Sequence, residues 1–169
     1  MKTVSMNLYL INELSKEAQI EAYNEWLDNE IEFPYDSEFS QSIDEFQEAF
    51  DFNYNTNYYN EVEFYDNDIA DLKGVRLYKY LINNYANIIN FDCKLTGYYI
   101  DNLLLKPIVE FMKKPRNITF AELMSECKEN WEEGYNKEHE WHFSFEHFVE
   151  DSLDLQRYYL ADGTLYSEC

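Results

Sequence analysis

The chain has 169 residues, with 34 Asp and Glu against 13 Lys and Arg and a formal net charge of −21. This charge disfavours direct binding to nucleic acid or to an anionic membrane, since both need clustered basic residues. The 16 Tyr, 12 Phe and 3 Trp supply the apolar area that acidic disordered chains lack. We therefore expect a single folded acidic domain over residues 1–169.

The N-terminal third is expected to hold one strand and two helices. Residues 3–11 alternate roughly between polar and apolar and predict a strand. Ser15 is the predicted N-cap of a helix that ends near Asn29. A second helix is expected over Ser37–Phe50. The outward acidic residues of these two helices are Glu17, Glu21, Glu25 and Asp28 on the first, and Asp44, Glu45 and Glu48 on the second.

The middle of the chain predicts a hairpin built from Phe50–Tyr54 and Glu61–Tyr65. Glu61 and Glu63 would lie on one face of its second strand, because side chains alternate along a strand. Three tyrosines stand here among Asn and acidic residues and are expected to be exposed, as interface tyrosines are. They are Tyr54, Tyr58 and Tyr59.

Four further helices are predicted, over residues 75–90, 98–113, 119–138 and 144–153, followed by a hairpin of Arg157–Leu160 and Thr164–Ser167. The third of these helices begins with a capping box of Thr119 and Glu122. The expected fold class is therefore α+β, a helix-rich single domain. Its small antiparallel sheet would be formed by the N-terminal strand, the central hairpin and the C-terminal hairpin.

The distribution of charge carries the functional prediction. From Glu17 to Leu72 the chain has 17 Asp and Glu and no Lys, Arg or His. A second acidic row, made of Glu122, Glu126, Glu129 and Glu133, follows one face of the 119–138 helix, at spacings close to those of phosphates along a strand. Two interpretations stay open: a surface that imitates a nucleic-acid backbone, and a solvated face that maintains solubility.

Cysteine and histidine provide a second, weaker signal. Cys93, Cys127, His139 and His142 are candidate zinc ligands, because thiolate and imidazole are the ligands zinc prefers. No Cys-x-x-Cys pair is present, and the two histidines are one residue short of the His-Glu-x-x-His spacing of zinc proteases. Cys127 also lies on an apolar stripe, where a buried thiol is ordinary. A structural zinc site is the alternative interpretation of these four residues.

The sequence offers little that is typical of an enzyme. It has no glycine-rich phosphate loop, no nucleophile elbow and no Ser/His/Asp order. Carboxylate pairs suited to hydrolysis are abundant, but 34 acidic residues produce such pairs by chance. The lack of these motifs predicts a non-enzymatic protein. Three widely spaced cysteines are typical of reduced thiols, and with no signal-peptide core they predict a cytoplasmic protein.

Two segments carry a resemblance to known proteins. The predicted strand followed by Glu13–Gln19, with Ala22 and Trp26, resembles a box of small phage-encoded proteins. The closing segment Leu160–Tyr166 resembles the C-terminal strand of the same group. Acidic members of that group include anti-CRISPR proteins that inhibit type II-A Cas9. The resemblance implies a phage origin and a counter-defence role, and it does not extend over residues 33–114.

Together, charge and resemblance predict an inhibitor that binds the basic nucleic-acid cleft of a host defence nuclease such as Cas9, which presents Lys and Arg to its nucleic acids. No cofactor is required. The expected partner-binding residues are the acidic row of the 119–138 helix, then Asp44, Glu45, Glu48, Glu61 and Glu63, with Tyr58 and Tyr59. The alternatives are an inhibitor of a restriction enzyme or a DNA-repair protein, and a zinc-stabilised adaptor.

Overall fold

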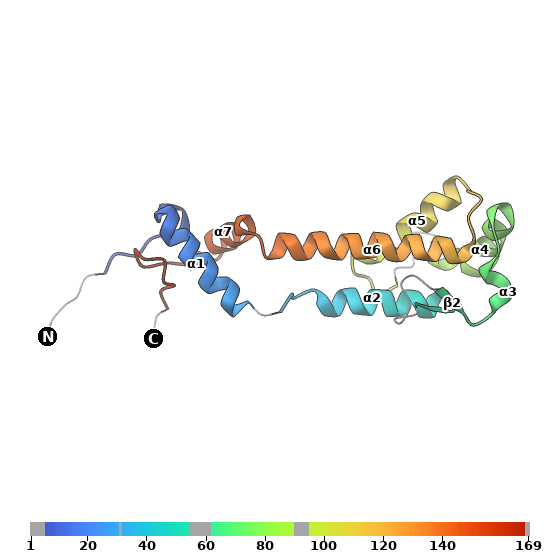
Figure 1. The fold of residues 1–169 in the computed structure, drawn as a ribbon, viewed down its shortest axis with the longest axis horizontal. Coiled ribbons are helices and arrows are strands. Elements are labelled where there is room, and N and C mark those ends of the chain that lie inside the picture. Colours follow the sequence, from blue (N-terminus) through green and yellow to red (C-terminus); the bar gives the residue numbers. More distant parts are fainter. Residues whose placement is uncertain (1–5, 31, 55–61, 90–94, 168–169) are drawn as a thin grey trace. The chain divides into compact units, whose positions relative to one another are not determined.

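The computed structural model describes residues 6–30, 32–54, 62–89 and 95–167, apart from the side chain of Asn67. In this part of the chain it has seven α-helices, one 3₁₀ turn and one hairpin (Figure 1). In chain order these are η1 (Ile11–Glu13), α1 (Lys16–Asn29), α2 (Asp36–Ala49), β1 (Phe52–Tyr54), β2 (Val62–Phe64), α3 (Asn67–Ala70), α4 (Gly74–Ile89), α5 (Asp101–Lys113), α6 (Phe120–His142) and α7 (Phe145–Asp154).

The chain divides into two compact units. Unit 1 comprises residues 1–33 and 137–169, and unit 2 comprises Pro34–Asn136, so α6 contributes residues to both. Each unit has its own cluster of buried side chains. The expectation of a single domain stays a prediction, since two compact units of one chain can still fold together.

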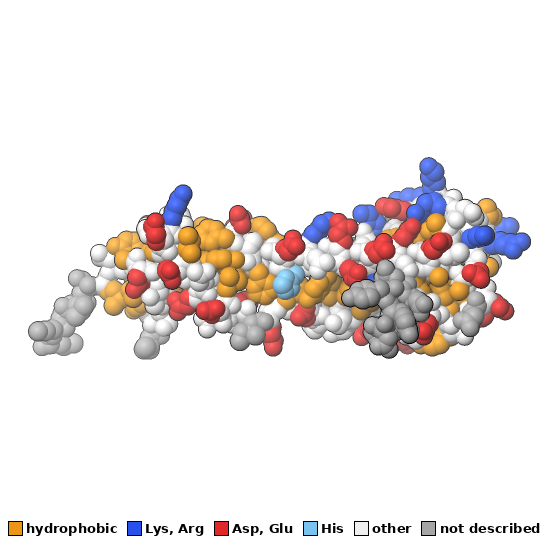
Figure 2. Space-filling model, viewed as in Figure 1, with side chains coloured by type: hydrophobic (Ala, Val, Ile, Leu, Met, Phe, Trp, Pro, Cys, Tyr) orange, Lys and Arg blue, Asp and Glu red, His pale blue; other side chains and the backbone are white. Residues whose placement is uncertain are grey.

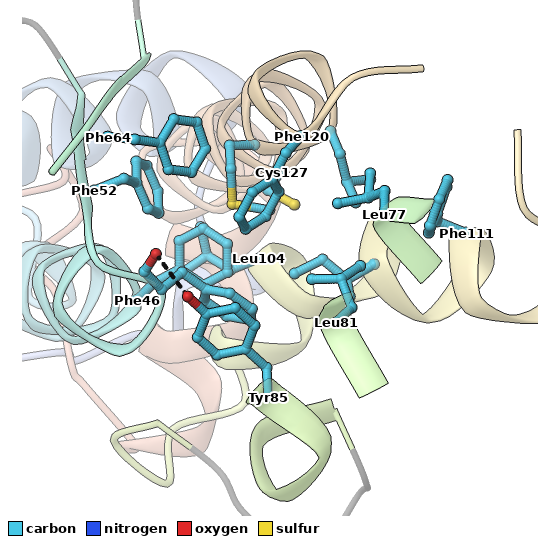
Figure 3. Packing of buried hydrophobic residues seen from close by; sticks show 14 residues of the cluster. Phe46, Phe52, Phe64, Leu77, Leu81, Tyr85, Leu104, Phe111, Phe120 and Cys127 are labelled. Atoms are coloured by element: carbon cyan, nitrogen blue, oxygen red, sulfur yellow. Dashed lines mark hydrogen bonds between the residues drawn. The ribbon is translucent and has the colours of Figure 1, made fainter. Parts of the chain in front are cut away.

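Unit 2 has an aromatic core to which α2, the hairpin, α4, α5 and α6 all contribute (Figure 3). Phe120 of α6 lies against Phe64 of β2, with ring centroids 4.7 Å apart. Burial of each such ring contributes about 1.5–3 kcal/mol, which offsets part of the self-repulsion of the acidic chain. The fourteen buried members are Phe46, Phe50, Phe52, Phe64, Leu77, Leu81, Tyr85, Leu104, Ile108, Phe111, Phe120, Leu123, Met124 and Cys127.

The contact between α5 and α6 accommodates a proline inside α5. Pro107 has no N–H, so the carbonyl of Leu103 loses its helical partner. The Nδ2 of Asn130 on α6 donates a hydrogen bond to that carbonyl at 2.6 Å. One turn further along α6, Gly134 leaves room for the Leu103 side chain, since a Cβ there would lie 2.4 Å from Leu103 Cδ1. Asn130 and Gly134 therefore make the close approach of the two helices possible.

The central hairpin is present and antiparallel, with Phe52 paired to Phe64 and Tyr54 to Val62. It is shorter than predicted. Tyr54 was expected to be exposed, and that expectation is wrong. Its ring is half-buried, and its hydroxyl donates a 2.7 Å hydrogen bond to the backbone carbonyl of Met124. Burial is also the main reason that the pKa of this phenol is raised.

Unit 1 is smaller and packs around α1 and α7. Ala18 and Ala22 present the small side chains of α1 to the core, which also contains Phe148 of α7 and Tyr159. The Tyr23 hydroxyl donates a 2.6 Å hydrogen bond to the carbonyl of Phe143. Ser15 is the N-cap of α1, as the sequence predicts, and its hydroxyl accepts the N–H of Ala18.

The predicted α+β fold, with one sheet formed by the N-terminal strand, the central hairpin and the C-terminal hairpin, is wrong. The described residues hold one sheet, formed by β1 and β2 alone. Tyr9 makes only an isolated bridge to Tyr159, because the next N–H, of Leu10, binds the Glu13 carboxylate and the chain turns into η1. This turn buries Ile11 completely.

At the C-terminus a turn about Gly163 replaces the predicted hairpin of two strands. Tyr159 and Leu165 form one more isolated bridge, and backbone hydrogen bonds join Leu160 to Thr164 and Tyr166 to Tyr158. These few hydrogen bonds do not form a continuous pair of β-strands. The molecule is therefore predominantly helical.

Candidate partner-binding surface

The exposed face of α1 presents four carboxylates in a row. Glu17, Glu21, Glu25 and Asp28 are all exposed, and none makes an ion pair with a described residue. Successive members are three or four residues apart, so their Cβ atoms lie about 5–6 Å apart on the helix surface. Like charges at this spacing oppose local helix stability by a few tenths of a kcal/mol per pair. The row is therefore not explained by the stability of α1.

A fifth carboxylate joins this row from the end of the chain. Asp162 lines a hollow of about 340 Å³ together with Glu21, Glu25 and Asp28, and no basic residue lines it. The Asp162 carboxylate accepts the N–H of Thr164 at 3.1 Å. This hydrogen bond lowers the pKa of Asp162, so the group is ionised at neutral pH. The hollow therefore concentrates four negative charges.

The turn that places Asp162 there depends on one glycine. Gly163 has φ +97°, and a Cβ at this position would lie 2.2 Å from the carbonyl oxygen of Ala18. Only a residue without a side chain can let the turn approach the backbone of α1 so closely. The backbone atoms nearest to this position belong to Ala18 and Ala22 of α1.

The acidic row of α6 differs from that of α1, because two of its carboxylates have hydrogen-bond partners near the start of the helix. The Glu126 carboxylate accepts two hydrogen bonds from the Arg116 guanidinium, and the bond from Nη1 is 2.9 Å long. The charge of Glu126 is therefore matched by a cation. Glu122 accepts the N–H and the hydroxyl of Thr119 in the predicted capping box. These hydrogen bonds are the main cause of its lowered pKa. Two of the four carboxylates thus serve the structure of α6 itself, while Glu129 and Glu133 are exposed.

The acidic residues of α2 face solvent as predicted. Asp44 and Glu45 line a hollow of about 480 Å³ with Thr96 and Tyr98, and Glu48 is also exposed. Figure 2 shows acidic side chains distributed over the visible face of the molecule, whereas basic ones gather over α4 and α5 of unit 2.

The remaining predicted partner-binding residues are in and beside the hairpin. Glu63 of β2 is exposed. Glu61, Tyr58 and Tyr59 lie outside the described residues.

The four candidate zinc ligands do not form a site in the described residues. Cys127 is completely buried in the core of unit 2, and burial raises the pKa of its thiol. His139 and His142 belong to unit 1, where both rings pack against Phe33. Cys93 lies outside the described residues. Among the described residues no group of three His, Cys, Asp or Glu side chains is arranged to hold a metal ion.

His142 is instead part of an aromatic cluster in unit 1. Its ring packs against Trp26 and Phe143, and its Nε2 lies 3.6 Å from a carboxylate oxygen of Glu30. His147 lies beside it, with ring centroids 5.2 Å apart. Desolvation lowers the pKa of His142 below its ordinary value of 6.5, with the neighbouring His147 and His139 acting in the same direction and Glu30 opposing them.

We expect this cluster to make the stability of unit 1 depend on pH. A histidine with a lowered pKa in the folded state is protonated more readily when unfolded, so the free energy of unfolding falls as the pH drops below 6.5. Thermal unfolding of the protein and of His142→Phe, each at pH 7.5 and 5.0, measures the effect. The loss on acidification should be smaller in the variant. Equal losses would contradict this role of His142.

Sequence reasoning missed Asp162 as a member of the acidic surface. The signal was an Asp before a Gly, which was recognised as a turn and not as a binding residue. The α1 carboxylates were recognised as a row, but the turn that joins them arrives from more than 130 residues away in the chain. Only the folded structure brings these groups to one hollow.

No described helix is both long and apolar enough to cross a membrane. Comparison of the chain with known protein families, with characterised proteins and with solved structures finds no match.

Proposed function

We propose that this protein inhibits a nucleic-acid-binding nuclease, such as a Cas9-type defence nuclease, by covering part of its basic cleft. The observation that carries the proposal is the acidic hollow of unit 1. Four carboxylates, from Glu21, Glu25, Asp28 and Asp162, line it without a basic residue. A hollow of this kind complements a protruding Arg or Lys, which binds carboxylates by charge-assisted hydrogen bonds.

Electrostatics also supports a partner of this kind. The net charge of −21 attracts a basic surface at long range and speeds association with it at low salt. The Cβ spacing of about 5–6 Å in the α1 row approximates that of phosphates, so a cleft built for a nucleic-acid strand is complementary to the row. The resemblance of Glu13–Gln19 to phage-encoded proteins favours a defence nuclease as the partner.

A pair of charge-reversal variants tests the proposal. The first carries Glu21→Lys, Glu25→Lys and Asp28→Lys, and it should lower the affinity for guide-free Cas9 about 100-fold, because several close charge pairs are lost. The matched control carries Glu146→Lys, Glu150→Lys and Asp154→Lys on α7, which are exposed in the same unit and change the net charge equally. The control should lose less than about fivefold.

Binding is measured by surface plasmon resonance at low and high salt, and inhibition by cleavage of target DNA. Equal losses in the two variants would mean that net charge, and not the α1 surface, carries binding. If the unmodified protein captures no Cas9 at low salt, a defence nuclease of this type is not the target. The same assay with a restriction enzyme and a DNA glycosylase then decides between the alternative target classes.

A further inference from the structure

Another hollow lies in unit 2, between α4 and α5, and its lining differs from that of the acidic hollow of unit 1. Its volume is about 400 Å³, within the range of roughly 300–1,000 Å³ typical of small-molecule sites. One wall is a stripe along α4 and the other is formed by α5. The lining residues are Tyr78, Ile82, Ala86, Ile89, Val109, Met112 and Lys113. The hollow is therefore apolar, with a single charged group at its edge.

The α4 wall is a second apolar face of that helix. Leu77 and Leu81 already point into the core of unit 2, where both are completely buried. Ile82 is 41% exposed, although a helix of a water-soluble protein usually presents polar residues on the side away from its core. Tyr78 and Ile89 also pack against the core cluster of unit 2, but Ile82 is not among the residues packed against it. Core packing of unit 2 thus does not account for Ile82.

A kink in α4 shapes this wall. Tyr85 has non-helical backbone angles, φ −126° and ψ 19°, inside the helix. Its phenol is buried, and its hydroxyl donates a hydrogen bond to the carbonyl of Phe50 (Figure 3). Ile82 precedes the kink, whereas Ala86 and Ile89 follow it, so the lining residues come from both sides of the bend. The kink at this core residue thus lies between the α4 residues that line the hollow.

The charge around this hollow is opposite to that of the chain as a whole. Helix α4 contains Arg76 and Lys79 and no acidic residue, and Lys73 precedes it. In α5 and the segment after it, four cations stand against the exposed Glu110 and the buried Asp101. These cations are Lys106, Lys113, Lys114 and Arg116. Arg116 is paired with Glu126, whereas Lys113 lines the hollow itself and so acts on a bound ligand from within the screening distance of about 8 Å.

Two polar groups lie at the hollow. Lys113 is exposed and makes no ion pair with any residue in the described ranges. Tyr78 is half-buried and lines the same hollow. An ammonium beside an apolar hollow is a donor that a carboxylate needs.

We propose that the α4–α5 hollow binds an amphipathic monocarboxylate, with the acyl chain between α4 and α5 and the carboxylate on Lys113. The net charge of −21 favours a small ligand with one charge over an acidic protein or a second copy of this chain, both of which the whole molecule repels. The hollow is separate from the acidic surface of unit 1, so this inference does not depend on the proposed function.

Three probes with hydrocarbon chains of similar length test the charge preference. Decanoate, 1-decanol and decyltrimethylammonium differ mainly in the charge of the head group. Unspecific attraction to an acidic protein would favour the cation, whereas the hollow should favour decanoate by about tenfold over decanol and by more over the cation. Methyl NMR of Met112, Ile82 and Ile89 reports binding at this place. Shortening the chain to nine carbons should weaken binding about fourfold.

Matched variants identify the groups responsible. Lys113→Gln should weaken decanoate binding about tenfold and leave decanol unchanged. Lys114→Gln removes the same charge one residue away, outside the hollow, and should change the decanoate affinity less than twofold. Ala86→Leu fills the hollow without a change of charge and should weaken decanoate and decanol alike.

Three results would overturn the proposal. The first is the absence of saturable methyl shifts with decanoate. The second is tighter binding of decyltrimethylammonium than of decanoate at these methyl groups. The third is an equal loss in Lys113→Gln and Lys114→Gln, since that would show a general effect of charge in place of a carboxylate held by Lys113.

Discussion

Replacing Gly163 with alanine should lower the free energy of unfolding of unit 1 by about 3 kcal/mol. Two costs add at this position. An L-residue at φ +97° is strained, and the new Cβ would lie 2.2 Å from the carbonyl oxygen of Ala18. Backbone atoms of α1 cannot rotate away as a flexible side chain can. The turn must therefore move from α1, and Asp162 should move with it.

Gly97 provides the matched control for this substitution. It also has a positive φ, of +92°, but a Cβ there would meet nothing within 4 Å. Gly97→Ala should therefore show only the conformational cost, about 1–2 kcal/mol. If both variants lose the same stability, the close approach of the turn to Ala18 does not contribute.

Fluorine NMR of 5-fluorotryptophan distinguishes the two units during unfolding. The chain has three Trp, of which Trp26 and Trp141 belong to unit 1 and Trp131 to unit 2. In Gly163→Ala the signals of Trp26 and Trp141 should reach their unfolded positions at lower urea, while that of Trp131 changes less. The variant should also lose affinity for the proposed nuclease partner, because the acidic hollow is disrupted.

The second large effect is expected at Asp101, a buried carboxylate in unit 2. It is 1% exposed and accepts four hydrogen bonds. One oxygen accepts the hydroxyls of Ser42 and Thr96, each at 2.8 Å, and the other accepts the N–H groups of Thr96 and Gly97 at 3.0 and 2.9 Å. This carboxylate thus joins α2, residues 96–97 and the first turn of α5.

Asp101→Asn should destabilise unit 2 by about 2–4 kcal/mol, since hydrogen bonds to a charged group contribute roughly 1.5–3 kcal/mol and an unmade buried bond has a further cost. In Asp101→Asn an NH₂ group replaces one of the two carboxylate oxygens. This group cannot accept a hydrogen bond, so the two donors that pointed at that oxygen lose their acceptor. Ser42→Ala removes only one of the four bonds and should cost about 1 kcal/mol.

Urea unfolding followed at Trp131 measures both Asp101→Asn and Ser42→Ala, and amide hydrogen exchange locates the change. The N–H groups of Thr96 and Gly97 should exchange faster in Asp101→Asn than in the unmodified protein. Unchanged exchange at these two amides would show that the carboxylate does not hold the segment.

Local patterns were sufficient to predict most helices. Ser15 caps α1, Thr119 and Glu122 form a capping box at α6, and apolar residues at helical spacing lie in the cores. Capping and periodicity depend on residues a few positions apart, so they can be recognised in one sequence. The prediction of an extended sheet was wrong because alternation over a few residues does not determine whether a partner strand is in reach.

The sequence by itself determined the charge of the molecule, the position of its longer helices and the acidic row of α1. Tertiary structure alone decided which carboxylates are matched by a cation and which share a hollow. Glu126 is matched by Arg116, ten residues away, whereas α1 gains Asp162 through a turn that only Gly163 permits. The apolar hollow beside Lys113 likewise needs two helices, α4 and α5, to form its walls. Such contacts depend on distances in space between residues that are remote in the chain, and these distances are properties of the folded state.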